Sequence, residues 1–148
     1  MTKRILFVLL ATSVLPLRAQ AQTAADTAAV TATALNYVEG WYEGSAERMT
    51  TALHPDLAKR IVRTGADGVS RLEHMSADQL ISGAGRGGGK NTPKERQIKK
   101  VAVLDLHGDV AIVRAEMGGW FDWMELAKWN GEWKIVNVLW QMKPPSKN

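Results

Sequence analysis

The chain has 148 residues, with 19 Lys and Arg against 15 Asp and Glu, and no cysteine. This length suits one domain with a single hydrophobic core, and the lack of cysteine excludes disulfides and lipid attachment through a cysteine. The first 21 residues hold three of the basic residues and no acidic one, which leaves 16 basic and 15 acidic residues beyond them. Because nucleic-acid binders carry a clear basic excess, we expect no nucleic-acid partner.

The first 21 residues have the pattern of a cleavable signal peptide. Lys3 and Arg4 precede an apolar run that reaches Leu17, and Ala19 and Ala21 frame an A-x-A cleavage site. Polar residues and a proline interrupt this run, so it is too short for a permanent membrane helix. We predict cleavage near Ala21 and a periplasmic or secreted product; a retained membrane anchor is the alternative, which the cleavage site opposes. The chain then divides into a signal peptide, one domain and a polar tail, at residues 1–21, 22–143 and 144–148.

Helical periodicity opens the predicted domain. A helix capped by Asp26 or Thr27 is expected to run to about Tyr42, since apolar residues recur along one of its faces. These residues are Val30, Ala34, Tyr37, Val38 and Trp41. Ser45 can cap a second, short helix, which the His54–Pro55 pair ends because a residue before proline avoids the helical region.

The segment after this proline mixes helical and extended signals. A further helical turn is expected through Leu57, followed by two short β-like pieces within residues 61–75 around a turn at residues 65–68. Ser76 can cap a brief helix over residues 77–81. We therefore expect the helices to come first in the chain, with short connecting elements after them.

An alternating, strand-like pattern takes over from residue 95. Asn130–Gly131 is the strongest hairpin signal in the chain and favours a type I′ turn. The predicted strands cover residues 97–106, 110–117, 120–129 and 132–142. Helices first and an antiparallel sheet second predict an α+β fold, in which the helices cover one face of a strongly curved, mostly antiparallel sheet.

The last hairpin has apolar side chains on both of its faces. With a regular register, Asp122, Asn137 and Gln141 share one face with apolar neighbours. The helices can cover one face, and a second subunit is the simplest cover for the other. The alternative is that the N-terminal segment folds over it. We predict a homodimer that packs through the face carrying Trp123, Val136 and Val138.

Four stretches resemble a known family. Residues 40–49 and 52–60 are similar to the opening of the putative lumazine-binding family, and residues 120–126 and 130–140 are similar to its ending. This family is part of the nuclear transport factor 2-like (NTF2-like) superfamily, which includes ketosteroid isomerases and SnoaL-type polyketide cyclases. The resemblance implies a cone, in which a curved sheet wraps around a long helix with a pocket at the open end, and frequent dimerisation.

The preferred functional hypothesis is non-catalytic binding of a small, flat, partly apolar molecule. Trp41, Trp120, Trp133 and Trp140 can stack on such a ligand, although aromatic residues at this spacing also fill cores. The residues predicted to bind it are Trp41, Tyr42, Trp120, Asp122, Asn137 and Gln141. One alternative is an isomerase- or cyclase-like enzyme with Asp122 or His74 as its general base. The other is a dimeric protein-interaction module.

The glycine-rich residues 83–90 match no cofactor motif in its proper context. Their spacing fits a dinucleotide fingerprint, but the segment follows a helix where that motif requires a strand, and it lacks the Ser/Thr of a P-loop. We predict that this segment is a mobile loop. It is either a disordered linker or a lid in which Arg86 and Lys90 face an anionic ligand. Three isolated histidines make no metal signature. We therefore expect neither a cofactor nor a metal site.

Overall fold

The computed structural model describes residues 15–144, with side chains from residue 23 onward. The helices are α1 (Leu15–Glu43), α2 (Ala46–Ala52) and α3 (Ala77–Gly85), with a 3₁₀ turn at Lys94–Arg96. The strands are β1 (Leu53–Thr64), β2 (Ser70–Ser76), β3 (Lys100–His107), β4 (Val110–Glu116), β5 (Trp120–Trp129) and β6 (Glu132–Met142). Residues 1–14 of the predicted signal peptide and residues 145–148 of the predicted tail lie outside the described part.

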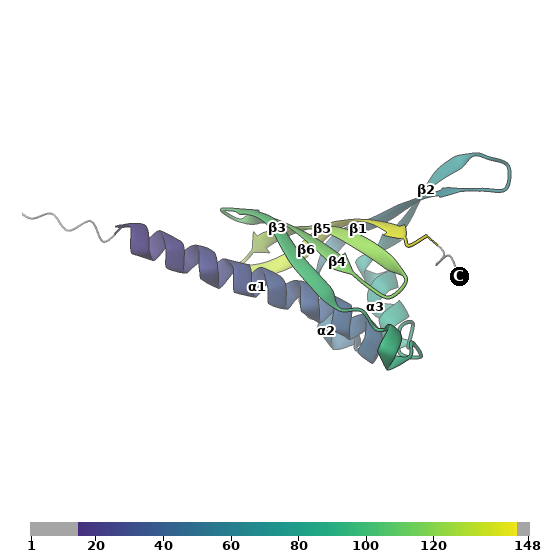
Figure 1. The fold of residues 1–148 in the computed structure, drawn as a ribbon, viewed down its shortest axis with the longest axis horizontal. Helices are drawn as coiled ribbons and strands as arrows, with labels where there is room; N and C mark the ends of the chain where they lie inside the picture. Colours follow the sequence, from purple (N-terminus) through teal and green to yellow (C-terminus); the bar gives the residue numbers. More distant parts are fainter. Residues whose placement is uncertain (1–14, 145–148) are drawn as a thin grey trace, which may run out of the picture.

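The strands form one open sheet in the order β2-β1-β6-β5-β4-β3. All neighbouring pairs are antiparallel except β1 and β6, which run parallel. Helix α1 lies along one face of the sheet, and α2 and α3 lie near the C-terminal end of α1 (Figure 1). The predicted α+β class, with N-terminal helices packed on a mostly antiparallel sheet, is thus confirmed.

Helix α1 is longer than the sequence pattern predicts. Neither Asp26 nor Thr27 caps it, because the helix already begins at Leu15. Between Pro16 and Asp26 the sequence contains no proline or glycine that would interrupt the helix. Instead, Asp26 accepts hydrogen bonds from Lys128 Nζ at 2.7 Å and from Trp133 Nε1 at 3.2 Å. These bonds tether α1 to β5 and β6. Of the helices within residues 15–144, none has the length and hydrophobicity needed to cross a membrane.

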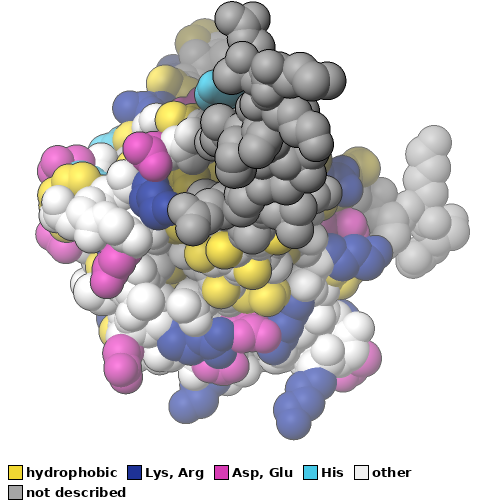
Figure 2. Space-filling view, turned by 90° about the vertical axis from the view of Figure 1, so that its left-hand side faces the viewer, with side chains coloured by type: hydrophobic (Ala, Val, Ile, Leu, Met, Phe, Trp, Pro, Cys, Tyr) yellow, Lys and Arg dark blue, Asp and Glu magenta, His cyan; other side chains and the backbone are white. Residues whose placement is uncertain are grey.

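Side chains of both charge signs are distributed around the end of the molecule from which α1 extends. Viewed from that end, both basic and acidic groups occur around the surface, and hydrophobic groups gather near the middle (Figure 2). The predicted apolar face of α1 is directed into the core, where Val30, Ala34, Tyr37 and Val38 are all buried. The helical periodicity therefore identified the core-facing side of α1 correctly.

The predicted helical turn after Pro55 is wrong, because Leu53–Thr64 forms strand β1. Its inward residues alternate, with Leu57, Lys59 and Ile61 all buried. β1 pairs with β2 on one side and with β6 on the other. Its parallel partner β6 comes roughly 80 residues later in the chain. Local propensity reflects only neighbouring residues, so it does not predict this pairing.

The Asn130–Gly131 turn joins β5 and β6 as predicted, with positive φ at both residues (52° and 82°). The register beyond it differs from the regular one. Leu126 pairs with Ile135, but Glu125 pairs with Asn137, so Val136 is an extra residue on β6. This β-bulge reverses the facing of every later residue of β6.

The bulge corrects the predicted sheet faces. Val138 and Trp140 turn toward the helices, opposite Met124 and Asp122, and Val138 is only 2% exposed. The predicted dimer face therefore cannot include Val138. Asn137 turns outward, where its Nδ2 donates to Glu125 Oε2 at 2.9 Å. Leu139 and Gln141 share this outer face with Trp123 and Glu125, whereas Val136 is the bulged residue and is half-buried.

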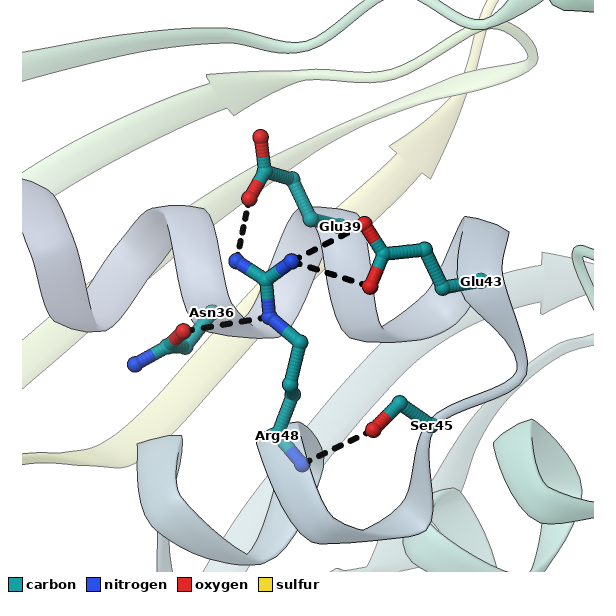
Figure 3. A network of polar contacts seen from close by, with 5 residues as sticks. All are labelled: Asn36, Glu39, Glu43, Ser45 and Arg48. Carbon is teal, nitrogen blue, oxygen red and sulfur yellow. Dashed lines mark hydrogen bonds and ion pairs between the residues drawn. The ribbon is translucent and has the colours of Figure 1, made fainter.

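Arg48 fastens α2 to α1 (Figure 3). Its guanidinium forms an ion pair with Glu39, donates to both carboxylate oxygens of Glu43 at 2.9 Å, and donates to Asn36 Oδ1 at 3.2 Å. Its backbone N–H donates to Ser45 Oγ, which confirms Ser45 as the N-cap of α2. The network holds α2, which leads directly into β1, against the C-terminal part of α1.

Replacing Arg48 with Ala is expected to lower the free energy of unfolding by about 1 kcal/mol, because several half-exposed charge contacts are lost together. Urea unfolding monitored by circular dichroism measures this change. Arg71→Ala is the matched control, since its ion pair joins two exposed side chains, Asp67 in the turn before β2 and Arg71 near the start of β2. A control variant that destabilises as much as Arg48→Ala would contradict the assigned role.

Candidate functional site

A cavity of about 350 Å³ lies between the helices and the inner face of the sheet. Its walls come from α1, α3, the turn after α3, and the strands β1, β2, β5 and β6. The residues that line it are Tyr37, Trp41, Lys59, Met75, Gln79, Leu80, Gly83, Arg86, Trp120 and Trp140. Elements from both ends of the chain therefore meet around one small cavity, to which four aromatic side chains contribute.

A buried polar cluster lies in the wall of this cavity. Lys59 Nζ forms an ion pair with Asp122 Oδ1 and donates to Tyr37 Oη at 2.7 Å. Tyr37 Oη donates to Asp122 Oδ2 at 3.2 Å, and Trp120 Nε1 donates to the same oxygen at 3.0 Å. The carboxylate thus receives three donors from three different elements, which satisfies a charge that is costly to bury.

Burial sets the ionisation of this cluster. Asp122 is fully buried and Lys59 is 3% exposed. Desolvation lowers the pKa of Lys59, and the neighbouring Asp122 charge opposes that shift. Desolvation also raises the pKa of Tyr37 well above its ordinary value, and the Asp122 charge and hydrogen bond add to this. Tyr37 is therefore a neutral hydroxyl at physiological pH.

Aromatic rings surround the ammonium group. Lys59 Nζ lies 4.8 Å from the Trp140 ring centroid, 5.3 Å from that of Tyr37 and 6.0 Å from that of Trp120. The ring of Trp120 meets those of Trp41 and Trp140 edge-on, at 6.0 Å and 6.3 Å between centroids. These contacts fix the flat walls of the cavity.

The glycine-rich segment forms hydrogen-bonded turns that pack on Trp41. α3 continues to Gly85, and the Gly88 N–H donates to the Gly83 carbonyl at 3.0 Å. A Cβ atom at Gly89 would lie 2.3 Å from Trp41 Cδ1, and one at Gly88 would lie 2.6 Å from Cη2 of the same ring. Residues 83–89 are therefore a close-fitting support for one cavity wall, in place of the predicted mobile loop.

The structure brings three of the six predicted ligand-binding residues to this cavity. Trp41 and Trp120 line it, and Asp122 lies behind Lys59 and Trp120. Asn137 and Gln141 lie on the opposite face of the sheet, where they border an outer groove. The bulge at Val136 separates them from the other three.

Tyr42 and His74 also lie away from the cavity. Tyr42 Oη accepts from the Gly118 N–H at 2.8 Å and donates to the Ile98 carbonyl at 3.3 Å, beside a second, more polar cavity of about 540 Å³. His74 is exposed on β2, opposite Arg60. It is therefore not adjacent to Asp122.

Sequence reasoning missed Lys59 and Tyr37 as site residues. Tyr37 was recognised only as part of the apolar face of α1. The sequence does contain a signal for Lys59. In a strand every second residue points to the same side, so Lys59 shares the inward side with Leu57 and Ile61. That signal requires β1 to be recognised as a strand, which the preceding proline obscured.

Solved structures with the same fold come from several bacteria. An NTF2-like protein of unknown function from Silicibacter pomeroyi is 19% identical, with a TM-score of 0.63, and the match covers 82% of this chain and 98% of that one. One from Methylobacillus flagellatus is 23% identical, with a TM-score of 0.61 and coverages of 81% and 94%. An NTF2-like protein with a cystatin-like fold from Novosphingobium aromaticivorans is 11% identical, with a TM-score of 0.65 and coverages of 92% and 94%.

These similarities establish the fold and no activity, since all three identities are low. A search of curated proteins finds no significant match. The family model described as "Putative lumazine-binding" matches residues 25–141, which include α1 from residue 25 onward, strands β1 to β5, and β6 except its last residue. The chain therefore belongs to the putative lumazine-binding family and has the NTF2-like fold.

Proposed function

We propose that this protein is exported and that its inner cavity binds a small, flat, partly apolar molecule. The observation that carries the proposal is the cavity of about 350 Å³ between Trp41, Trp120 and Trp140. This volume lies at the lower end of the range for small-molecule sites, and such sites combine aromatic walls with a few fixed polar groups. The description of the family as lumazine-binding supports a flat heterocycle as one possible ligand.

The arrangement of Asp122 favours binding over general-base catalysis. A general base needs a lone pair within hydrogen-bonding reach of the substrate. The Asp122 carboxylate is fully buried and already accepts from Lys59, Tyr37 and Trp120. Its role in this arrangement is to orient Lys59 and Trp120, which do line the cavity. The isomerase- or cyclase-like alternative would require this cluster to open.

Native mass spectrometry of residues 22–148, purified gently from the producing cells, tests the proposal. A retained small molecule is expected, with a mass that identifies it. Trp41→Leu is expected to lower the fraction of ligand-bound protein at least about tenfold, because a stacking wall is lost. Trp129→Leu is the matched control, since Trp129 is 45% exposed and does not line the cavity. Equal retention by both variants would exclude this cavity as the site.

Export is proposed from the signal-peptide pattern, and the fold is compatible with it. Cleavage after Ala21 would remove the first residues of α1, from Leu15 to Ala21, and keep the rest of the helix. Among the side chains described, the first buried one is Asp26, which would remain and still bind Lys128 and Trp133. The shortened helix would then carry Asp26 in its first turns, where a negative charge is favourable.

Homodimerisation through the outer face of the sheet is a second part of the proposal. This face exposes Val62 at 59%, Leu139 at 57% and Trp123 at 38%, next to an outer groove of about 730 Å³. Exposed apolar patches of this kind are typical of subunit interfaces. The face proposed here includes Trp123 from the predicted interface and replaces Val138 with Leu139.

Trp123→Glu is expected to convert a dimer into a folded monomer, because it places a charge at the centre of this patch. Light scattering coupled to size-exclusion chromatography measures the subunit number, and circular dichroism verifies folding. Trp129→Glu is the control, since it introduces the same charge at an exposed tryptophan outside the patch. A monomeric wild-type protein would contradict the dimer.

A further inference from the structure

We propose that the cavity selects anionic ligands, namely flat aromatic or heteroaromatic carboxylates or enolates, over neutral molecules of the same shape. This inference rests on the proposed binding function and specifies its ligand class. It follows from the polar groups that remain available around the cavity once the internal hydrogen bonds of the protein are satisfied.

The charges on the cavity wall are of one sign. Among the ten lining residues, all within the described part of the chain, Lys59 and Arg86 are basic and none is acidic. Asp122 balances Lys59 from behind and does not line the cavity. Arg86 lies exposed at the rim and has no carboxylate partner among the described residues. An entering ligand therefore meets a basic group that is not neutralised.

The remaining hydrogen-bonding groups are donors. Gln79 Oε1 already accepts from the Ser76 N–H at 2.9 Å, which leaves the amide NH₂ of Gln79 as its free end. Lys59 uses two of its three N–H groups on Asp122 and Tyr37. The hydroxyl of Tyr37 both donates and accepts within the cluster. The cavity thus offers several donors and few free acceptors.

Trp140, one of the lining residues, carries an unsatisfied donor of its own. Its ring lines the cavity, and its Nε1 is buried without a hydrogen-bond partner among the described residues. A buried N–H without a partner is costly and rare, so it calls for a group that completes it. An acceptor-rich, negatively charged ligand complements Lys59, Gln79 and Arg86 together, because charge-assisted hydrogen bonds are the stronger ones, and it is the group that we infer to complete Trp140 Nε1.

Two matched probes test the charge preference. 2-Naphthoate and 2-naphthamide have the same rings and differ in the charge of one substituent. Tryptophan fluorescence titration of the folded protein is expected to show about tenfold tighter binding of the carboxylate. Binding of the carboxylate is expected to weaken as salt is added, whereas binding of the amide stays constant.

Two variants assign the preference to this cavity. Arg86→Gln and Trp140→Phe are each expected to lower the ratio of carboxylate affinity to amide affinity severalfold, because each removes a donor that binds a charged acceptor more strongly than a neutral one. Arg114→Gln is the control, since Arg114 lies on the outer side of the sheet against Phe121. Circular dichroism spectra of all variants establish that they are folded.

The possible outcomes separate this inference from the proposed function. Equal affinity for the two probes, or tighter binding of the amide, would overturn the anionic preference and leave a binding cavity. A carboxylate preference that persists in both variants would also overturn it, because residues outside this cavity would then recognise the charge of the ligand. Failure of both probes to bind would overturn the proposed function and this inference together.

Discussion

Lys59→Met is expected to lower the free energy of unfolding by about 3–5 kcal/mol at neutral pH. The substitution keeps most of the length of the side chain but leaves the Asp122 carboxylate fully buried without its counter-ion. The hydrogen bonds from Tyr37 and Trp120 would remain, and they cannot replace a full charge. Urea unfolding measured by circular dichroism gives the change directly.

A double-mutant cycle separates the ion pair from other effects of the substitution. Lys59→Met combined with Asp122→Asn is expected to be more stable than either single variant, because no unpaired charge stays buried and the amide oxygen still accepts from Trp120. The same cycle on the exposed Arg71–Asp67 pair serves as the control and should show little coupling. If the changes in the free energy of unfolding at Lys59 and Asp122 were additive, the two side chains would not interact as the structure shows.

Val138→Asp is expected to prevent stable folding, whereas Leu139→Asp is expected to leave the fold intact. Val138 is 2% exposed on the helix side of the sheet, and a buried, unpaired carboxylate there costs several kcal/mol, roughly the stability of a small domain. Leu139 is 57% exposed on the outer side, so its replacement leaves the core unchanged. Thermal unfolding of both purified variants measures the difference.

This pair of variants tests the bulge at Val136 itself. A regular register places Leu139 on the helix side and Val138 outside, and it predicts the reverse order of stabilities. Because Leu139 lies in the proposed dimer face, Leu139→Asp is also expected to be monomeric, with its secondary structure retained. An unfolded Leu139→Asp variant alongside a folded Val138→Asp variant would refute the register seen in the structure.

The cavity suggests why an ion pair is retained in the protein interior. Lys59 and Asp122 hold together β1 and β5, while Tyr37 ties α1 to both. An apolar pair of similar volume would pack these elements without fixing the orientation of the Trp120 ring. The cluster therefore keeps the flat walls of the site in place, a role that the double variant tests through its ligand affinity.

Local sequence patterns were sufficient for the elements whose signals are local. The apolar spacing along residues 30–41 predicted the buried face of α1, and Ser45 and Ser76 cap α2 and α3 as expected. The Asn130–Gly131 pair predicted the last hairpin, because few sequences tolerate two consecutive positive φ angles. Together these elements determine the α+β class, and residues 40–60 and 120–140 carry the family resemblance.

The composition of the site was decided by contacts between distant parts of the chain. β1 is a strand because it is inserted between β2 and β6, and that pairing overrides the helical signal after Pro55. One extra residue at Val136 moved Trp140 into the cavity and Asn137 out of it. The sequence alone was enough to predict the three helices, the last four strands and the family that the chain resembles. The tertiary structure decided that Lys59, Asp122 and Trp140 meet, because side-chain facing depends on strand register and each shift of one residue reverses it.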